Sequence, residues 1–399
     1  MALLFEYQYA PPWSIVCISI ILSYVALLRM LRLKCLRRFE AEDSRYAQDC
    51  YRTMDYKAAH RIVRRLLRRE FPFMYGFGVQ WALIKSYGIA NGTKLLVQTR
   101  QLTSKVTVGK RAEDTGVFIY EILVSGIDSD RGLRTMAKMN WLHRRYGSKI
   151  TNGDMIHTLG LFVLEPARWI NEREWRALSY VERAAIFIYW KEIGNRMGMH
   201  DIPATLEDLE TWMVEYEKQH MYYAESNKKC VEATWDLFLH NVPLSLHGFM
   251  KTITSAFIQD HVRPALGMTT PPRWISLVVD YGFVVRAFVL WNLFLPRFRE
   301  RDDVLREAKD GRLYRNSYMF EPWYVQQTVV SRLMSWLPFS GQLHPGPEFK
   351  SNGFMPEELG PLEFEQQSRA PALKEADQLR AYAEKGGAVG VGCPFAFRP

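Results

Sequence analysis

The hydrophobic pattern of the chain begins with an uncharged segment near the N-terminus. Residues 7–28 contain no charged side chain, and residues 13–28 within them are strongly apolar. A helix of about 20 such residues can cross the hydrocarbon core of a bilayer. Glu6 precedes the segment and Arg29 follows it, whereas a cleaved signal peptide carries its positive charge in front. We therefore predict a lumenal N-terminus over residues 1–6 and an uncleaved transmembrane anchor over residues 7–28.

The body of the chain has a helical hydrophobic pattern, and the strict alternation typical of strands is scarce. Ser179 with Glu182, and Thr205 with Asp208, form capping-box patterns that open helices. We expect Pro166 to close a helix and residues 94–98 and 105–108 to form a short β-like patch. Helices are predicted over residues 55–69, 113–124, 129–146, 154–164, 179–193, 205–223, 232–239, 248–261 and 274–295.

This pattern predicts a mainly α protein, with a single-pass N-terminal transmembrane helix followed by one large helical domain. Residues 29–69 form a basic juxtamembrane region, and residues 70–339 form the large domain. Residues 340–399 are rich in Gly, Pro and Glu, so we expect a loosely ordered tail with one short helix near residues 372–384.

Positive charge is concentrated directly after the predicted anchor. The whole chain has a net charge of +9, and residues 29–69 alone contain 13 Lys and Arg against 5 Asp and Glu, a net of +8. Basic residues at this position favour binding to an anionic membrane surface rather than to nucleic acid. By the positive-inside rule the large domain is cytosolic.

Several kinds of site are excluded by the absence of their motifs. The five cysteines are scattered without a CxxC pair, which fits a reducing compartment rather than a disulfide framework or a zinc site. The chain contains no GxGxxG, Walker A, HExxH or GxSxG motif. Cys393 in GVGCPF lacks the preceding Phe and Arg of a P450 haem ligand, so we set that interpretation aside.

One predicted helix places a histidine beside small and soft side chains. At 100° per residue, Gly132, Met136, Met139 and Asn140 lie within about 60° of His143, and so does Gly147 if the helix reaches it. Arg134, Lys138 and Arg145 lie on the opposite side. A buried stripe normally consists of Leu, Ile and Val, and small residues leave space beside the ring, which a flat macrocycle needs. A core histidine with a hydrogen-bonded ring remains the alternative, and His157 and His200 are rival ligands.

A second helix brings a cation and a hydroxyl group together. Arg111 and Thr115 are four positions apart in RAEDTGVFIYEI and share one helix face. Such a pair suits a carboxylate or a bound oxygen species. The alternative is an ordinary helix start that Asp114 or Thr115 caps.

These stretches together resemble a known family. An Arg-x-x-x-Thr pattern 28 positions before a helical histidine is similar to the haem-dependent oxygenases related to the latex clearing protein. The likeness is closer to the fungal branch, the endoplasmic-reticulum-bound MpaB oxygenase family of mycophenolic acid biosynthesis. It extends over about residues 111–217 and rests on RAEDTGVFIYEI, MNWLHRRYGSKITNGDM, LEPARWI, ERAAIFIYW and MGMHDIPATLEDLETW.

The resemblance implies a function and a set of site residues. It implies a helical domain that binds haem b in the endoplasmic reticulum membrane. The expected reaction is O₂-dependent cleavage of a C=C bond in the farnesyl side chain of a phthalide meroterpenoid. His143 matches the axial haem ligand, and Arg111 and Thr115 match the pair beside the haem, where we expect catalytic and cofactor-binding roles. We place Asn140 among the residues that contact the cofactor, because it shares the His143 face.

The chain departs from the latex clearing proteins at three positions. Asn140 and Gly147 stand where those proteins have arginines, and Asp114 stands where they have lysine. The resemblance assigns no general base to this chain. A second hypothesis also fits the anchor and the apolar helices, namely a non-catalytic, membrane-anchored carrier of lipids or isoprenoids.

Overall fold

The structure is a computed structural model that describes residues 13–300, 304–334 and 343–387. Within these ranges the chain forms sixteen α-helices and one two-stranded antiparallel sheet, so the mainly α prediction is confirmed. Short π-helical segments, Leu66–Glu70 and Glu121–Ser125, extend α3 and α6. The elements are α1 (Trp13–Asp43), α2 (Cys50–Thr53), α3 (Tyr56–Arg65), α4 (Pro72–Ser86), α5 (Ala90–Thr99), α6 (Val108–Tyr120), α7 (Asp130–Arg144), α8 (Asn152–Arg173), α9 (Tyr180–Arg196), α10 (Leu206–His220), α11 (Glu225–Phe238), α12 (Leu244–Ser255), α13 (Arg263–Leu266), α14 (Arg273–Leu293), β1 (Leu305–Glu307), β2 (Leu313–Arg315), α15 (Val329–Met334) and α16 (Glu365–Glu384).

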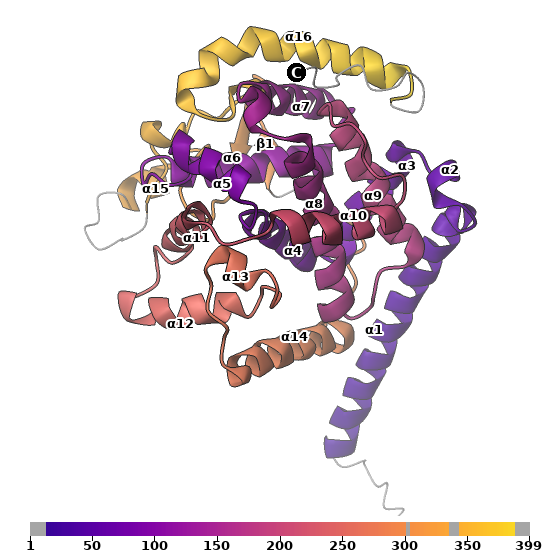
Figure 1. Ribbon diagram of the computed structural model, residues 1–399. Coiled ribbons are helices and arrows are strands. Elements are labelled where there is room, and N and C mark those ends of the chain that lie inside the picture. The colour runs from indigo at the N-terminus through magenta and orange to yellow at the C-terminus, as the bar shows by residue number, and fades with distance from the viewer. Residues whose placement is uncertain (1–12, 301–303, 335–342, 388–399) are drawn as a thin grey trace, which may run out of the picture.

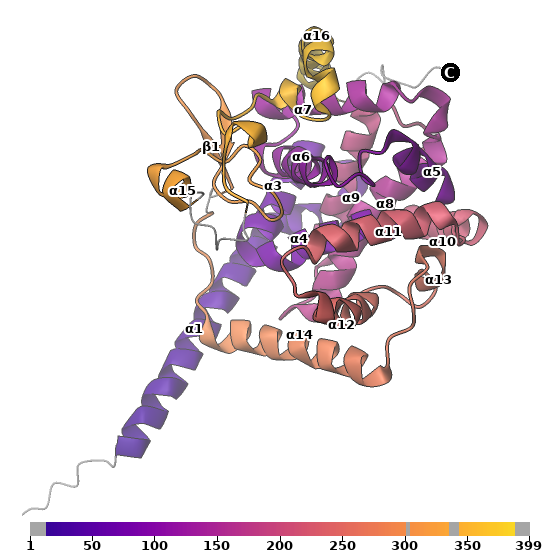
Figure 2. The same cartoon turned by 90° about the vertical axis from the view of Figure 1, so that its left-hand side faces the viewer.

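The helices are arranged around α4, α8 and α9, which form the centre of the body (Figure 1). Trp169 of α8 and Phe187 of α9 are almost completely buried there. α16 lies over α7 at one end of the body, and α14 lies at the opposite end (Figures 1 and 2). The N-terminal part of α1 extends past α14, away from the body (Figure 2).

Two helices among the described residues are long and apolar enough to cross a membrane. They are Trp13–Tyr46, which contains the part of the predicted anchor that the structure describes, and Arg273–Leu293. Almost all of the apolar stretch of each helix is exposed in the structure. The second helix was predicted as an element of the large domain. A helix packed within that domain would bury its apolar side chains, but those of this helix are mostly exposed.

A close helix contact in the core joins α4 to α8. A Cβ atom on Gly78 would lie 2.5 Å from the Cα atom of Pro166, so only glycine permits this approach. Pro166 was expected to close a helix, and this prediction was wrong, because α8 continues through the proline to Arg173. The contact with Gly78 places the proline-containing turn inside the core, where packing offsets the loss of one helical hydrogen bond.

Because Gly78 contacts backbone atoms that cannot move aside, Gly78→Ala should destabilise the protein. We expect overpacking to cost about 1–3 kcal/mol of unfolding free energy. Gly76 lies on the same helix, and a Cβ atom there would meet nothing within 4 Å. Gly76→Ala should therefore be neutral or stabilise the helix by about 0.5–1 kcal/mol. Thermal unfolding of Gly78→Ala and Gly76→Ala tests this prediction, and equal destabilisation of the two variants would contradict it.

Most predicted helix starts are confirmed by their caps. Ser129 accepts a hydrogen bond at the start of α7, and Ser179 and Thr205 form the predicted capping boxes of α9 and α10. The β-like patch was wrong, since residues 94–98 lie within α5. Thr93 explains the difference, because its hydroxyl group bonds Asn227 of α11 and so holds α5 as a helix against that element.

The C-terminal region also differs from the prediction of a loosely ordered tail. Among its described residues, α16 packs along α7 and buries Ala372, Leu379 and Tyr382. This helix is longer than the predicted one over residues 372–384. Its apolar side chains lie among many charged ones, so the helical pattern in the sequence is weak, and the contact with α7 stabilises the helix.

Candidate functional site

His143 lies in the last turn of α7 and carries its proton on Nδ1. That atom lies 2.7 Å from the carbonyl oxygen of Met139. A carbonyl oxygen only accepts hydrogen bonds, so Nδ1 donates and Nε2 keeps its lone pair. In the part of the chain that the structure describes, Nε2 has no hydrogen-bond partner. The ring therefore offers an unprotonated nitrogen, which is the form of imidazole that binds a metal.

The surroundings of His143 keep the ring neutral. Burial lowers its pKa below the ordinary value of 6.5, and the positive charge of Arg111 lowers it further, against the opposing effect of the Met139 hydrogen bond. The side chain of His143 nevertheless remains partly exposed to solvent. The ring is therefore enclosed but still partly accessible. A hydrogen-bonded core histidine also has the bond to Met139, so this bond alone does not separate the two interpretations.

Arg111 and Thr115 form one polar unit on α6. The guanidinium Nη1 donates to the Thr115 hydroxyl oxygen at 2.7 Å, and the hydroxyl group donates to the Arg111 carbonyl oxygen at 2.7 Å. Both side chains are partly exposed. The other guanidinium N–H groups of Arg111 have no partner among the described residues. The positive charge of Arg111 lowers the pKa of His143, so the two side chains are near each other. The structure thus brings an arginine with free donors close to the predicted ligand, where it can bind a carboxylate.

The stripe of small residues beside His143 has a different role from the predicted one. A Cβ atom on Gly132 would lie 1.9 Å from the carbonyl oxygen of Gly126, so this glycine permits a backbone contact at the start of α7. Met136 is completely buried in the main core, and Met139 is partly buried beside it. On α6, by contrast, a Cβ atom on Gly116, next to Thr115, would meet nothing within 4 Å. Gly116 is exposed, so α6 has an open surface next to Thr115.

Asn140 is engaged away from the ring of His143. Its amide nitrogen donates to the carbonyl oxygen of Arg196 at 2.7 Å and to Glu375 at 2.9 Å. Both amide hydrogens are therefore used to join α7 to α9 and α16, while its side-chain oxygen has no partner among the described residues. We leave Asn140 out of the proposed cofactor contacts.

The rival histidines are placed differently from His143. His157 is 1% exposed, and its Nε2 lies 3.3 Å from Glu217, so this nitrogen already has a partner. His200 is largely exposed and bonds Asp201. The Nδ1 atom of His157 has no hydrogen-bond partner among the described residues, but its ring is almost completely buried, whereas the ring of His143 remains partly exposed. The ring of His200 is not enclosed.

Asp114, which stands where the latex clearing proteins have lysine, is a buried structural residue. It is 1% exposed and binds Lys110 at 2.6 Å. The hydroxyl group of Tyr324 donates to Asp114 at 2.6 Å, and the backbone N–H of Gly360 donates to it at 3.0 Å. These bonds fasten two C-terminal segments to α6, so Asp114 fixes the helix that presents Arg111 and Thr115. This role could not be predicted from the sequence, because Tyr324 and Gly360 lie more than 200 positions away from Asp114.

The basic side of α7 is covered by the C-terminal region. Arg134 binds Glu357, Lys138 donates to Ser368, and the guanidinium group of Arg145 lies 4.0 Å from the centre of the Phe364 ring. These contacts explain the basic residues opposite His143. They hold α16 and the segment before it, so the other side of α7 is the one available for chemistry.

Lys138 makes this contact sensitive to pH. Its pKa is lowered to about 8, first by burial and then by the charge of Lys110. Between pH 8 and 10.5 the folded protein has released this proton while the unfolded chain still holds it, so this group makes the protein more stable as pH rises. The unfolding temperature is measured at pH 7.5 and at pH 9.5. We expect Lys138→Met to remove the contribution of this group to the increase in stability between these two pH values. Lys374→Met, at an exposed site of α16, should leave it, and an unchanged rise in Lys138→Met would contradict the assignment.

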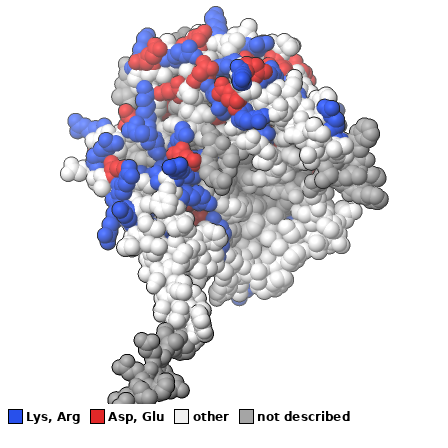
Figure 3. Space-filling model, turned by 180° about the vertical axis from the view of Figure 1, so that it is seen from behind, with Lys and Arg blue, Asp and Glu red and all other residues white. Residues whose placement is uncertain are grey.

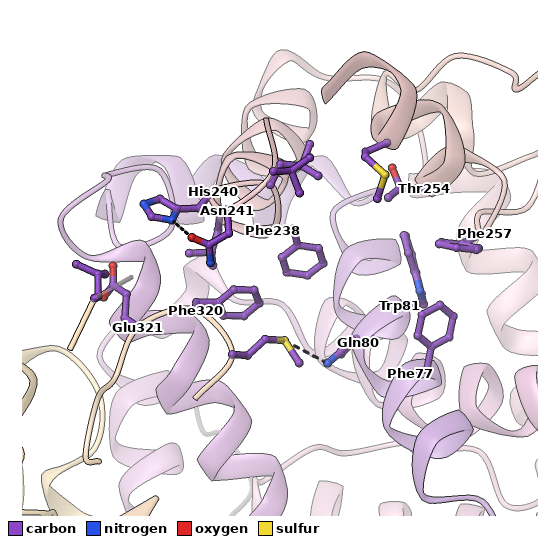
Figure 4. Close-up of a pocket in the computed structure, with 16 residues that line it drawn as sticks. Phe77, Gln80, Trp81, Phe238, His240, Asn241, Thr254, Phe257, Phe320 and Glu321 are labelled. Atoms are coloured by element: carbon purple, nitrogen blue, oxygen red, sulfur yellow. Dashed lines mark hydrogen bonds between the residues drawn. The ribbon is translucent and has the colours of Figure 1, made fainter. Parts of the chain in front are cut away.

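An apolar cavity of about 360 Å³ lies between α4, α11, α12 and the segment around Phe320. Phe238 and Phe320 stack at 5.1 Å, and Phe77, Trp81 and Phe257 line the other side (Figure 4). Polar groups are few, as in a site for a lipophilic ligand. No pattern along the chain indicated this cavity, because its walls come from four separate segments.

The cavity lies next to α6, because Glu113 of that helix accepts hydrogen bonds from the backbone N–H groups of Met319 and Phe320, which line the cavity. His143, Arg111 and Thr115 are not among the cavity-lining residues. Tyr87 directly follows α4, and the charge of Arg111 affects its pKa. Its hydroxyl group lies 3.5 Å from that of Thr234 on α11, one turn before Leu237 and Phe238 of the cavity wall. α11 thus contacts both the aromatic cavity and α6, the helix that carries Arg111 and Thr115.

A site for a bare metal ion is not found among the described residues, because no group of three or more His, Cys, Asp or Glu side chains converges there. A single histidine holds a metal firmly only when the metal brings its other ligands with it, as haem iron does. The free Nε2 of His143, the open α6 side and the unused donors of Arg111 all fit such a group, since haem carries carboxylates that an arginine can bind.

Comparison with known proteins finds a matching family model and several similar sequences. The family model described as "ER-bound oxygenase mpaB/B'/Rubber oxygenase, catalytic domain" matches residues 64–289. The chain is 29% identical to ER-bound oxygenase mpaB' of Penicillium brevicompactum over 378 residues, which is 88% of this chain and 89% of the relative. It is 29% identical to ER-bound oxygenase mpaB of Penicillium roqueforti (strain FM164) over 64% of this chain and 91% of the relative. It is 27% identical to ER-bound oxygenase mpaB of P. brevicompactum over 82% of this chain and 81% of the relative.

Proposed function

Since the chain belongs to the family of ER-bound mpaB/B' oxygenases and rubber oxygenases, we propose that it is a membrane-anchored, haem b-dependent oxygenase. It cleaves a C=C bond in the prenyl side chain of a meroterpenoid, such as a farnesylated phthalide. α1 crosses the endoplasmic reticulum membrane once, and the helical body lies on the cytosolic side. The observation that supports this best is the enclosed, neutral ring of His143 with its free Nε2.

Each residue of the site has a role in this proposal. His143 holds the haem iron through Nε2, and its hydrogen bond to Met139 fixes the tautomer and the ring orientation. Arg111 binds a carboxylate with its free donors, and Thr115 orients the guanidinium through their mutual hydrogen bonds. When bound, haem supplies the oxygen chemistry, and the protein supplies orientation and exclusion of water. We assign no general base.

The aromatic cavity suits the substrate of this reaction. A prenyl chain is apolar, and the rings around Phe238 and Trp81 enclose it and exclude water. Because the cavity adjoins the ends of α4 and α11, a bound chain extends toward the site of Arg111 and His143. A membrane anchor concentrates the enzyme where such a lipophilic substrate dissolves.

Product analysis tests the proposed reaction. One O₂ and one C=C bond give two carbonyl groups, so each fragment carries one oxygen atom from O₂. The full chain in microsomes, given a farnesylated phthalide under ¹⁸O₂, should release two shortened carbonyl products, each labelled with ¹⁸O. A non-catalytic carrier uses the same cavity without His143, and recovery of the bound substrate unchanged would favour it.

A further inference from the structure

The outward face of α14 is apolar along its whole length. Seven large apolar side chains, each more than half exposed, recur at helical spacing: Trp274, Leu277, Val278, Tyr281, Val284, Val285 and Phe288. Phe249 of α12 stacks on Trp274, and Leu246 of α12 is also exposed, so both helices form one surface. We name these nine residues the α12–α14 face. A contiguous apolar surface of this kind is rare on a monomeric soluble protein and marks an interaction site.

Apart from Arg273 at its first position, the charged side chains of α14 bind partners on the body. Asp280 binds Arg173 of α8, and Arg286 lies 2.9 Å from Glu174. Between them, the ring of Phe283 packs on Trp169 in the core. A helix at a water-facing surface has the opposite distribution, with its charges outside. The distribution in α14 is the one expected for a helix whose outer side is not in water.

The position of α14 against α1 identifies what covers this face. The hydroxyl group of Tyr24 donates to the carbonyl oxygen of Leu293, Arg29 binds Asn292, and Arg32 donates to the carbonyl oxygens of Leu290 and Phe294. The end of α14 therefore lies where the apolar part of α1 changes to its basic part. In a membrane-crossing α1, this is the level of the lipid headgroups.

The orientation of the two helices fits a helix lying along the membrane surface. α14 runs across the end of the body, while α1 continues beyond it (Figures 1 and 2). Seen from behind, charged side chains gather on the upper part of the molecule, and the lower part is almost without charge (Figure 3). Exposed Arg273 and Arg297 lie near the two ends of α14, where they can reach anionic headgroups.

From these observations we propose that the α12–α14 face docks on the lipid bilayer, so that α14 lies in the interface plane beside the anchor. This proposal rests on the proposed anchoring by α1 and not on the haem chemistry. α12 also contributes Met250 and Thr254 to the wall of the aromatic cavity. Docking therefore places one wall of that cavity against the membrane, from which a lipophilic substrate comes.

Spin-label depth measurements on the full chain test the docking. Single cysteines at Val278→Cys and Val285→Cys lie two turns apart on α14, and Ile20→Cys on α1 and Lys374→Cys on α16 are reference sites. The background carries Cys17→Ser, Cys35→Ser and Cys393→Ser (Cys393 lies outside the described residues), and it keeps the buried Cys50 and Cys230. The labelled protein is reconstituted in phosphatidylcholine–phosphatidylserine vesicles, and relaxation by O₂ is compared with relaxation by a water-soluble nickel chelate.

The proposal predicts that labels at positions 278 and 285 favour O₂ and lie at similar, shallow depths of about 5–10 Å. Ile20 should lie deeper, and Lys374 should be aqueous. Aqueous labels at 278 and 285 with a deep Ile20 would overturn the docking and leave the anchor intact, whereas an aqueous Ile20 would overturn the anchor itself. A depth that changes steeply from 278 to 285 would show a second membrane span and would also overturn the docking.

Discussion

Replacement of His143 by alanine is expected to remove bound haem and to lower oxygenase activity by about 100-fold or more, equivalent to about 2.7 kcal/mol of transition-state stabilisation. The physical reason is that the free Nε2 of this ring is the only proposed protein ligand of the iron. The fold should persist, because the ring is partly exposed and its one hydrogen bond is to its own helix. The measurements are the haem-to-protein ratio of the purified variant and its rate of product formation.

Two further variants make this prediction specific. His200→Ala removes a largely exposed ring that bonds only Asp201 among the described residues, and it should keep wild-type haem content and activity. His143→Gly leaves room for a free imidazole, so added imidazole should restore part of the haem binding. Full haem occupancy in His143→Ala would show that another residue is the ligand.

The second large effect is expected at Asp114. Asp114→Asn leaves the buried amine of Lys110 without its carboxylate partner. The new amide group also places N–H hydrogens opposite groups that donate to Asp114, such as the backbone N–H of Gly360. Breaking a buried pair in this way costs about 3–5 kcal/mol of folding free energy. We expect a lower unfolding temperature, accompanied by reduced haem affinity because α6 carries both Asp114 and Arg111. Thermal unfolding and haem titration of the variant measure the two effects.

The control for Asp114→Asn is a variant that breaks a solvent-exposed ion pair. Lys228 and Glu232 lie 3.9 Å apart on α11, and both are exposed. Glu232→Gln should change the stability by about 0.5 kcal/mol or less. If Asp114→Asn were as mild as Glu232→Gln, Asp114 would not be what fastens the C-terminal segments to α6.

Features that are local in sequence could be predicted, and those that depend on distant contacts could not. Ser129, Ser179 and Thr205 mark helix starts through side chains only three residues from the backbone groups that they cap. The prediction at Pro166 was wrong because α8 accommodates this proline by packing it against Gly78, which lies on another helix. The helix α16 was underestimated because the residues that stabilise it belong to α7.

The same distinction holds for the candidate site. Arg111 with Thr115, and His143 by itself, could be proposed from the sequence because each motif lies within one helix. The cavity around Phe238 and the partners of Asp114 come from segments far apart along the chain. Asn140 lies on the predicted face of α7, but its amide group bonds Glu375, a residue that no local pattern connects with it.

The absorbance spectrum of the purified full chain tests the central claim most directly. Ligation of haem by His143 predicts a Soret band near about 400–420 nm, with one haem per chain by extraction, and loss of the band in His143→Ala. A folded, colourless protein that stays colourless when haem is added would contradict the assignment of His143 and, with it, the proposed oxygenase mechanism.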